Sequence, residues 1–248
     1  MVVSNQSKLR YGTAQLNGEN LVVLQRVLEP EVMDTPEEAL DYDSMDHSQV
    51  NQLFVDDLIA GGEVGHDILD LGTGTAQIPI VLCQRTEDNR VMAVDLAIAM
   101  LDLARLNIEV ESLIQRISLD RVDAKDMPYA DGAFDLVISN SIIHHIPEPK
   151  KVFEESVRVL KKDGGRLFFR DLMRPETNER VAELVELYAG EENEHQQKMF
   201  DDSLRAALSL TEVRELVGWL GFDSESVQAT SDRHWTWQVV LNETDTSD

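Results

Sequence analysis

The stretch DILDLGTGTA, residues 67–76, decides the fold that this sequence specifies. Its first part, DILDL, is an apolar run of the length of a buried strand, and Gly72 and Gly74 follow as a tight turn. AQIPIVLCQRT (76–86) then has the length and apolar spacing of a helix. A strand, a glycine turn and a helix in this order predict the start of a βαβ unit.

The same alternation continues along the chain. β-branched runs predict further strands over residues 90–96, 116–122, 133–140 and 166–172. Helical spacing of apolar residues predicts helices over 97–113 and 149–161, around 181–188, and over 210–220 with Thr211 or Ser209 as the N-cap. The tail alternates polar residues with Trp235 and Trp237, which predicts a two-strand ending. The pattern as a whole predicts an α/β fold with a parallel sheet.

The residues before this alternation are less regular. A helix is predicted over 48–60, leading into the first strand, and Pro30 and Pro36 interrupt the stretch before it. We therefore predict that residues 1–66 form an N-terminal cap or lid, and that 67–248 form one globular domain.

The charge balance excludes several classes of function. The 248 residues contain 22 Lys and Arg against 47 Asp and Glu, a formal charge of −25. A phosphate backbone requires a surplus of basic side chains, so nucleic acid and anionic membrane surfaces are poor partners. The single cysteine, Cys83, excludes an intrachain disulfide and a multi-thiolate zinc site. With no signal-peptide pattern and no run of about 18 apolar residues, we expect a cytoplasmic protein.

The glycine turn and its neighbouring acids indicate the ligand. A dinucleotide site uses such a turn for pyrophosphate and generally has a third glycine, but residue 77 is Gln. Asp70, two residues before Gly72, would repel a pyrophosphate and suits an ammonium or sulfonium group. Asp95 ends the second strand, 21 residues after Gly74, where a carboxylate accepts hydrogen bonds from a ribose. A ribose joined to a cationic tail describes S-adenosylmethionine better than NAD.

With these residues in place, the chain resembles the class I S-adenosylmethionine-dependent methyltransferases, most closely small-molecule enzymes of the quinone-biosynthesis type. Four motifs carry the resemblance in the family's order: ILDLGTGTA (68–76), AVDLAIAMLDLA (93–104), VDAKDMPYADGAFDLVISNSIIHHI (122–146) and VLKKDGGRLFF (159–169). Thr75 stands where many members have a third glycine. The resemblance implies a Rossmann-like, seven-stranded, mostly parallel sheet with an antiparallel last strand and helices on both faces.

The resemblance also implies roles for particular residues. Those that would surround the methionine moiety are Asp70, Gly72, Gly74 and Asn140. Asp95 would hold the ribose, and the residues implied beside the adenine are Leu96, Met100, Asp123 through its carboxylate and Ala124 through its backbone N–H.

The candidates for chemistry follow the fourth predicted strand. His144 and His145 come soon after Asn140, and a histidine can accept a proton from a phenol, an enol or an ammonium. On an extended segment adjacent side chains point to opposite sides, so we expect one histidine to face the site, with His145 preferred, and the other to have a structural role. No metal is predicted, because nothing nearby in the sequence supplies further ligands at a usable spacing.

Candidates for acceptor binding lie elsewhere in the chain. Arg170 and Arg174 leave the fifth strand at the edge where such sheets bind ligands, and either could hold an acceptor carboxylate. The alternative is a structural ion pair between Arg170 and Asp171. Tyr42 and His47 are candidates for a lid over a small-molecule pocket.

The sequence thus predicts a methyltransferase for a small organic acceptor, as an O-, N- or C-methylating enzyme. The alternatives are a protein or RNA methyltransferase, for which a basic groove or long insertion is expected and not evident, and a non-catalytic S-adenosylmethionine-binding regulator. A homo-oligomer is compatible with the sequence.

Overall fold

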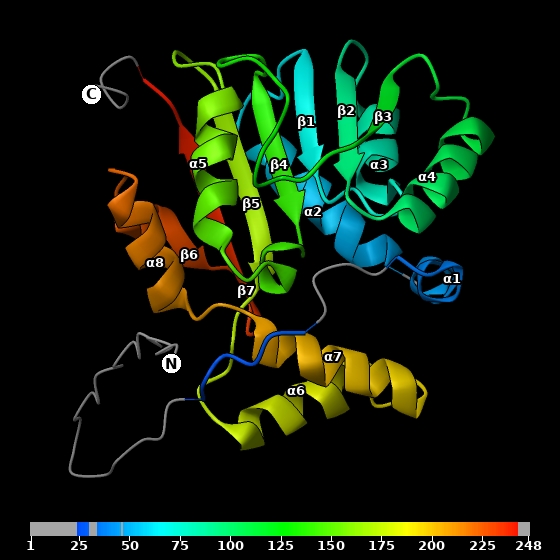
Figure 1. The fold of residues 1–248 in the computed structure, drawn as a ribbon, viewed down its shortest axis with the longest axis vertical. Coiled ribbons are helices and arrows are strands. Elements are labelled where there is room, and N and C mark those ends of the chain that lie inside the picture. Colours follow the sequence, from blue (N-terminus) through cyan, green and yellow to red (C-terminus); the bar gives the residue numbers. More distant parts are fainter. Residues whose placement is uncertain (1–23, 30–33, 46, 243–248) are drawn as a thin grey trace, which may run out of the picture.

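The structure, a computed structural model, describes residues 24–29, 34–45 and 47–242 (Figure 1). Its centre is one seven-stranded sheet in the order β3-β2-β1-β4-β5-β7-β6. The strands are β1 (Asp67–Leu71), β2 (Arg90–Asp95), β3 (Ile117–Arg121), β4 (Leu136–Asn140), β5 (Arg166–Leu172), β6 (Val227–Ala229) and β7 (His234–Val240). β1 to β5 pair in parallel, and β7 runs antiparallel to β5 and β6. The predicted Rossmann-like α/β fold, with its antiparallel last strand, is confirmed.

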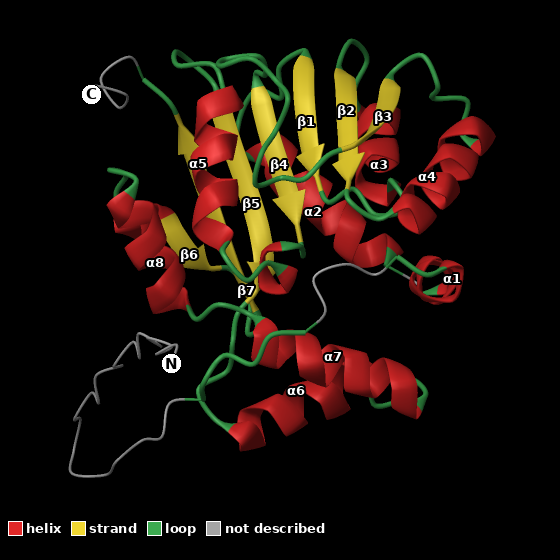
Figure 2. Ribbon diagram, in the orientation of Figure 1, coloured by secondary structure: helices red, strands yellow, loops and turns green. Residues whose placement is uncertain are grey.

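Helices surround this sheet (Figure 2). They are α1 (Pro36–Ser44), α2 (Ser48–Ala60), α3 (Gln77–Arg85), α4 (Ile98–Val110), α5 (Pro149–Val159), α6 (Asn178–Ala189), α7 (Glu194–Ala206) and α8 (Leu210–Trp219), with short 3₁₀ turns η1 (Ile143–His145) and η2 (Ser224–Ser226). Ser209 is the N-cap of α8 and forms a capping box with Glu212, which settles the choice between Ser209 and Thr211.

Two apolar layers form the core, one on each face of the sheet. α2, α3 and α4 cover one face, where Phe54 packs edge-on against Phe168 of β5 at a ring-centroid distance of 5.1 Å. α5 and α8 cover the other, where the Phe153 ring stacks on Trp237 of β7 at 5.2 Å. Trp235 and Trp237 are fully buried, as expected for residues packed on the sheet. Burial of this apolar area is the main favourable contribution to folding.

The functional edge of the sheet is the one at which the parallel strands end. The strand order reverses between β1 and β4, and in open α/β sheets the crevice outside the carboxyl ends at such a point holds the ligand. In Figure 1 the pair α6 and α7 lies beyond this edge, and α1 lies near the ends of β1 and β2. Residues 24–29, which we call the N-terminal strap, lie against α6 and α7. The backbone N–H of Leu24 donates to the carbonyl of Glu176, just before α6, and that of Val27 donates to the carbonyl of Arg205 in α7.

The N-terminal region does not behave as one separate layer. α2 belongs to the core through Phe54 and Leu58, whereas α1 packs on the start of α4 through Ala39. The cap predicted over 1–66 lies partly outside the described residues. α1 and α7 were not predicted, because both are rich in charged residues and bury few apolar side chains. Within the described residues, no helix has the length and apolar character needed to cross a membrane.

Candidate active site

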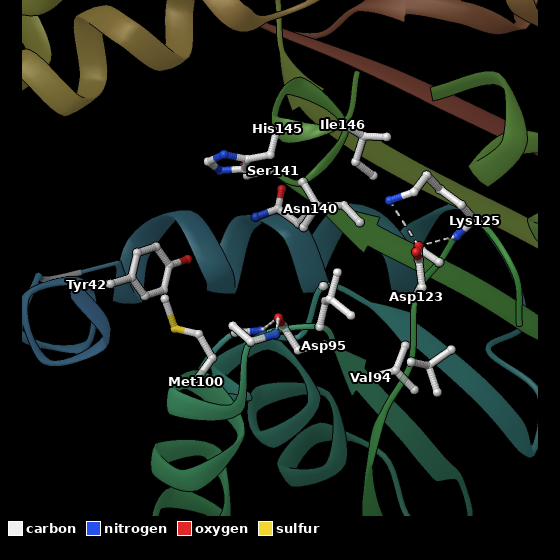
Figure 3. A pocket seen from close by; sticks show the side chains of 17 residues that line it. Tyr42, Val94, Asp95, Met100, Asp123, Lys125, Asn140, Ser141, His145 and Ile146 are labelled. Atoms are coloured by element: carbon white, nitrogen blue, oxygen red, sulfur yellow. Dashed lines mark hydrogen bonds and ion pairs between the residues drawn. The ribbon is translucent and has the colours of Figure 1, made fainter. Parts of the chain in front are cut away.

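A pocket opens at the carboxyl edge of the sheet, where the loops after β1, β2 and β4 meet (Figure 3). In this view Asn140 and His145 lie along one side, Asp95 and Met100 along the other, and Tyr42 and Asp123 at opposite ends. Of the residues predicted for the cofactor, those that line this pocket are Gly72, Gly74, Asp95, Leu96, Met100, Asp123, Ala124 and Asn140. Asp70 lines a second, smaller pocket, which shares Tyr42, Gly72 and Asn140 with the first.

The turn between β1 and α3 forms the floor of the site. Gly72 has φ +69°, and a Cβ there would lie 2.0 Å from Cγ2 of Ile142. This backbone conformation and this close approach both require glycine. Gly74 has φ +53°, and its N–H donates to Oδ2 of Asp95 at 2.9 Å. The turn therefore brings the backbone close to the pocket and connects it to the end of β2.

Asp95 is held in place by backbone donors on two elements. Besides Gly74, the N–H of Ala97 at the start of α4 donates to its Oδ1 at 2.9 Å. Burial raises the pKa of Asp95, and these hydrogen bonds act against that rise. Each carboxylate oxygen has a second acceptor site. Asp95 is thus a fixed double acceptor at the pocket wall, which is what a ribose diol requires.

Asp70 is a buried acid that forms no ion pair with a cation among the described residues, although the Thr73 hydroxyl opposes the rise of its pKa. The residue is 2% exposed, and among the described residues its Oδ2 receives no hydrogen bond. Burial, with a further contribution from the nearby Asp95 carboxylate, raises the pKa of Asp70 to about 7. An ionised carboxylate in such a place is stable only beside a cation. Asp70 therefore fits the ammonium group of a ligand's methionine end.

This shift predicts a pH-dependent affinity for S-adenosylhomocysteine. Below pH 7 the free protein carries a proton on Asp70, and binding of the ligand's ammonium must expel it. Affinity should therefore fall by about tenfold between pH 7.5 and pH 6 in isothermal titration calorimetry, since each pH unit below the pKa costs one factor of ten. Asp70→Asn should bind more weakly and show a flat profile over the same range. An equally steep profile in Asp70→Asn would assign the effect to another group.

The adenine end of the predicted site contains an ion pair that the sequence did not indicate. Oδ1 of Asp123 accepts from the backbone N–H of Lys125 at 2.9 Å and pairs with its Nζ at 3.1 Å. Lys125 lines the pocket with Asp123 and Ala124. The Asp123 side chain is 41% exposed, so its free acceptor sites remain accessible to a ligand.

The histidine pair differs from the predicted arrangement. We expected an extended segment with the two rings on opposite sides, but residues 143–145 form the 3₁₀ turn η1, and the two ring centroids lie 4.2 Å apart. A turn replaces the extended backbone because Ser141 adopts φ +59° directly after β4. His145 lines the pocket, whereas His144 is 3% exposed and lines neither of the two pockets described.

His144 forms a buried ion pair with Asp171 of β5. Its Nδ1 lies 2.5 Å from Oδ1 of Asp171, whose other oxygen accepts the backbone N–H of Ile143. Burial alone would lower the pKa of His144, but the Asp171 carboxylate, aided by Glu29, holds it above its ordinary value. His144 therefore connects the η1 turn to the end of β5.

Glu29 completes this cluster and was not predicted. Its Oε1 lies 3.2 Å from Nδ1 of His145 and 3.6 Å from Nε2 of His144. Burial raises the pKa of Glu29, and the charge of His144 acts in the opposite direction. No sequence signal marks Glu29, because it is more than 100 residues from the histidines and belongs to the irregular N-terminal region.

Arg170 and Arg174 do not take the predicted place at the acceptor. Arg170 pairs with Asp57 of α2 at 2.7 Å, and Arg174 pairs with Glu212 of α8 at 2.7 Å and donates to the Ala207 carbonyl. Neither lines the described pockets. The alternative pair of Arg170 with Asp171 is not formed either, because the two side chains have different partners. Both arginines join the sheet to its covering helices.

Tyr42 and His47, the predicted lid residues, do lie at the site. Tyr42 of α1 borders both pockets, and His47 borders the smaller one. Their ring centroids are 4.9 Å apart. Tyr42 of α1 and His47 at the start of α2 thus form an aromatic wall beside Asp70.

The sheet order, the glycine turn at the strand reversal and the two acids on neighbouring strands define a class I S-adenosylmethionine-dependent methyltransferase site. S-adenosylmethionine is the cofactor of this class, and the unpartnered Asp70 oxygen and the Asp95 carboxylate suit its methionine and ribose parts. Residues 69–169 match the family model described as a methyltransferase domain.

Known proteins agree with this assignment. The chain is 34% identical over 121 residues to the methyltransferase GfsG of Streptomyces halstedii, which covers 49% of this chain and 43% of that protein. It is 32% identical over 111 residues to the demethylmenaquinone methyltransferase of Porphyromonas gingivalis, covering 44% and 45%. The matched region thus spans less than half the length of these relatives. A crystal structure of an S-adenosylmethionine-dependent methyltransferase from Aquifex aeolicus has the same fold, with a TM-score of 0.59, 16% identity, and coverage of 84% of this chain and 98% of that one.

Proposed function

We propose that this protein transfers the methyl group of S-adenosylmethionine to a small organic acceptor. The observation that carries the proposal is that one pocket contains both the Asp95 carboxylate at the cofactor end and the His145 ring on the opposite side. A protein that only binds the cofactor needs the Asp95 carboxylate but has no use for a histidine facing it across the pocket. The demethylmenaquinone methyltransferase of Porphyromonas gingivalis, by its name, acts on a small molecule, which supports an acceptor of this size.

The residues of the chain supply alignment and a place for the acceptor's proton. The bound cofactor supplies a methyl group that is already activated by its sulfonium. A bond forms between the acceptor atom and the methyl carbon, the bond from methyl to sulfur breaks, and sulfur keeps the electron pair. Asp70 and Asp95 fix the two ends of the cofactor, and fixed alignment is worth about 7–11 kcal/mol of the barrier in such reactions. His145, with His144 behind it, is the group beside the acceptor's proton.

The charge of the chain supports a small acceptor over a polynucleotide. With a formal charge of −25, the protein repels anionic polymers, and the site lacks the basic groove that RNA binding requires among the described residues. The ion pairs of Arg170 and Arg174 remove two cations that could have faced an anionic acceptor.

A labelling experiment tests the proposed function. The full chain is incubated with methyl-labelled S-adenosylmethionine and a cell metabolite extract, and labelled products are identified by mass spectrometry. We expect at least one labelled small molecule, and far less of it with Asp95→Ala at the same cofactor concentration. Binding of S-adenosylhomocysteine without any labelled product from repeated extracts would favour the non-catalytic regulator. Binding of NAD without a response to S-adenosylhomocysteine would overturn the cofactor assignment.

A further inference from the structure

Three side chains with metal-binding atoms converge beside the pocket. They are Glu29 of the N-terminal strap, and His144 and His145 of η1, whose ligand atoms all lie within 4.8 Å of one another. Oε1 of Glu29 lies 3.2 Å from Nδ1 of His145 and 3.6 Å from Nε2 of His144. These side chains are shielded from solvent, with exposed fractions of 14% for Glu29, 4% for His144 and 20% for His145.

Asp171 orients His144 in the manner found behind metal-bound histidines. The Asp171 carboxylate binds Nδ1 of His144 at 2.5 Å, so that the opposite nitrogen, Nε2, faces Glu29. Metal-bound histidines commonly donate their second nitrogen to such a carboxylate, which fixes the ring and increases its basicity. Asp171 is itself held by the backbone N–H groups of Ile143 and Leu172. The ring therefore has one orientation before any ligand binds.

The strap carrying Glu29 is fastened to the same turn. The guanidinium of Arg26 donates to the carbonyls of His144 and Ile146 at 3.0 Å each, and to that of Ala206 at 2.6 Å. Ser203 of α7 donates to the Glu29 carboxylate at 3.2 Å. These contacts fix Glu29 relative to the histidines, so the three donors form a preorganised group from segments distant in the sequence.

We propose that Glu29, His144 and His145 bind a divalent transition-metal ion of the Zn²⁺ type. Two imidazoles and one carboxylate are a known donor set of catalytic zinc sites, which keep one further position open. Metal–ligand bonds of about 2.0–2.2 Å place the donors roughly 3–4 Å apart, and the separations of Glu29 from the two histidines fall in this range. Mg²⁺ and Ca²⁺ prefer sites made of oxygen alone. Two carboxylates, Glu29 and Asp171, offset the charge of the ion.

The open position of such an ion gives it a role toward the acceptor. His145 borders the pocket, so an ion held by its ring would lie beside that pocket, where an oxygen of the acceptor could become a further ligand. A hydroxyl or phenol oxygen bound there would lose its proton more readily, because the ion stabilises the oxyanion. In this role His145 is a metal ligand and the acceptor atom is an oxygen. The role rests on the proposed function, whereas the proposal that the three residues bind a metal does not.

Metal titration of the full chain tests the site without any turnover assay. After removal of metal with a chelator and desalting, isothermal titration calorimetry at physiological ionic strength should show one Zn²⁺ per chain with micromolar or tighter affinity. Co²⁺ should give the visible absorption band of a low-symmetry, four- or five-coordinate site. Glu29→Gln and His145→Ala should each weaken binding by at least about tenfold. The exposed controls Glu87→Gln and His195→Ala should bind as the unaltered chain does.

X-ray absorption at the zinc edge of the unaltered, Zn²⁺-loaded chain avoids the risk that a variant fails to fold. It should show two imidazole nitrogens and a carboxylate oxygen at about 2.0–2.2 Å. Absence of one-to-one binding would overturn the proposal and leave a proton shared among the histidines and carboxylates. Equal affinity in Glu29→Gln would overturn it too, by placing the ion on the acidic surface. Binding of S-adenosylhomocysteine, measured separately, reports on the proposed function alone.

Discussion

Replacement of His145 by alanine should lower turnover on the acceptor identified by labelling by about 10²–10⁴-fold, the range typical of a lost acid–base group. His145 borders the pocket opposite Asp95, so under the proposed function its loss removes the group that acts on the acceptor's proton, directly or through a bound ion. The predicted cofactor residues lie at the ends of β1, β2 and β4 and in the loop after β3, and none of them belongs to η1. Affinity for S-adenosylhomocysteine should therefore change by less than about threefold. Steady-state kinetics and calorimetry measure the two quantities.

The matched control for this variant is His195→Ala, which removes an exposed imidazole on α7 and should leave both quantities unchanged. His144→Ala should also reduce turnover, with an added loss of thermal stability, because it leaves the buried Asp171 carboxylate without its ion-pair partner. Near-normal turnover in both single variants and in the double variant would show that the reaction depends on alignment alone. The acceptor would then be a group that is already nucleophilic, such as a neutral amine or a thiolate.

Replacement of Asp95 by alanine should weaken S-adenosylhomocysteine by about a hundredfold. Two charge-assisted hydrogen bonds to the ribose are lost, at about 1.5–3 kcal/mol each before water compensates part of the loss. The structure adds a second cause, because Asp95 also accepts the N–H groups of Gly74 and Ala97 and so fixes the glycine turn and the start of α4. Calorimetry at a pH above 7.5, where Asp70 is largely ionised, isolates this effect from that of Asp70.

The comparison variant is Asp88→Ala, an exposed acid in the loop before β2, which should bind the ligand normally. Circular dichroism and a thermal melt without ligand show whether Asp95→Ala keeps the fold. A folded Asp95→Ala chain that loses less than threefold in affinity would mean that Asp95 does not hold the ribose. The roles carried over from the family motifs would then be out of register.

The parts of the site that could be predicted from the sequence are those defined by short, local patterns. Gly72, Gly74 and Asp95 lie within one βαβ unit, in which strand ends and turns follow directly from the order of residues. Their meeting at one sheet edge follows from the parallel pairing of β1 with β2. The two-strand ending could likewise be predicted from the alternation around Trp235 and Trp237, which determines which side chains face the core.

Predictions failed where long-range pairing decides the outcome. Arg170 has the same sequence context whether it faces an acceptor or Asp57, and only the packing of α2 on the sheet places Asp57 within 2.7 Å. For the histidine pair, His145 does border the pocket, but the predicted extended backbone is wrong, because the left-handed conformation of Ser141 turns the chain into η1.

The sequence by itself thus determined the α/β class, the order of the strands, and the two acids, Asp70 and Asp95, that line the pockets at the strand ends, since periodicity and glycine placement act over a few residues. Only the tertiary structure decided that Glu29, His144 and His145 meet. Their approach depends on Arg26 binding the carbonyls of η1 and on α7 supporting the strap, contacts between segments more than 100 residues apart. Such contacts arise from the packing of complete elements, and no local pattern of residues encodes them.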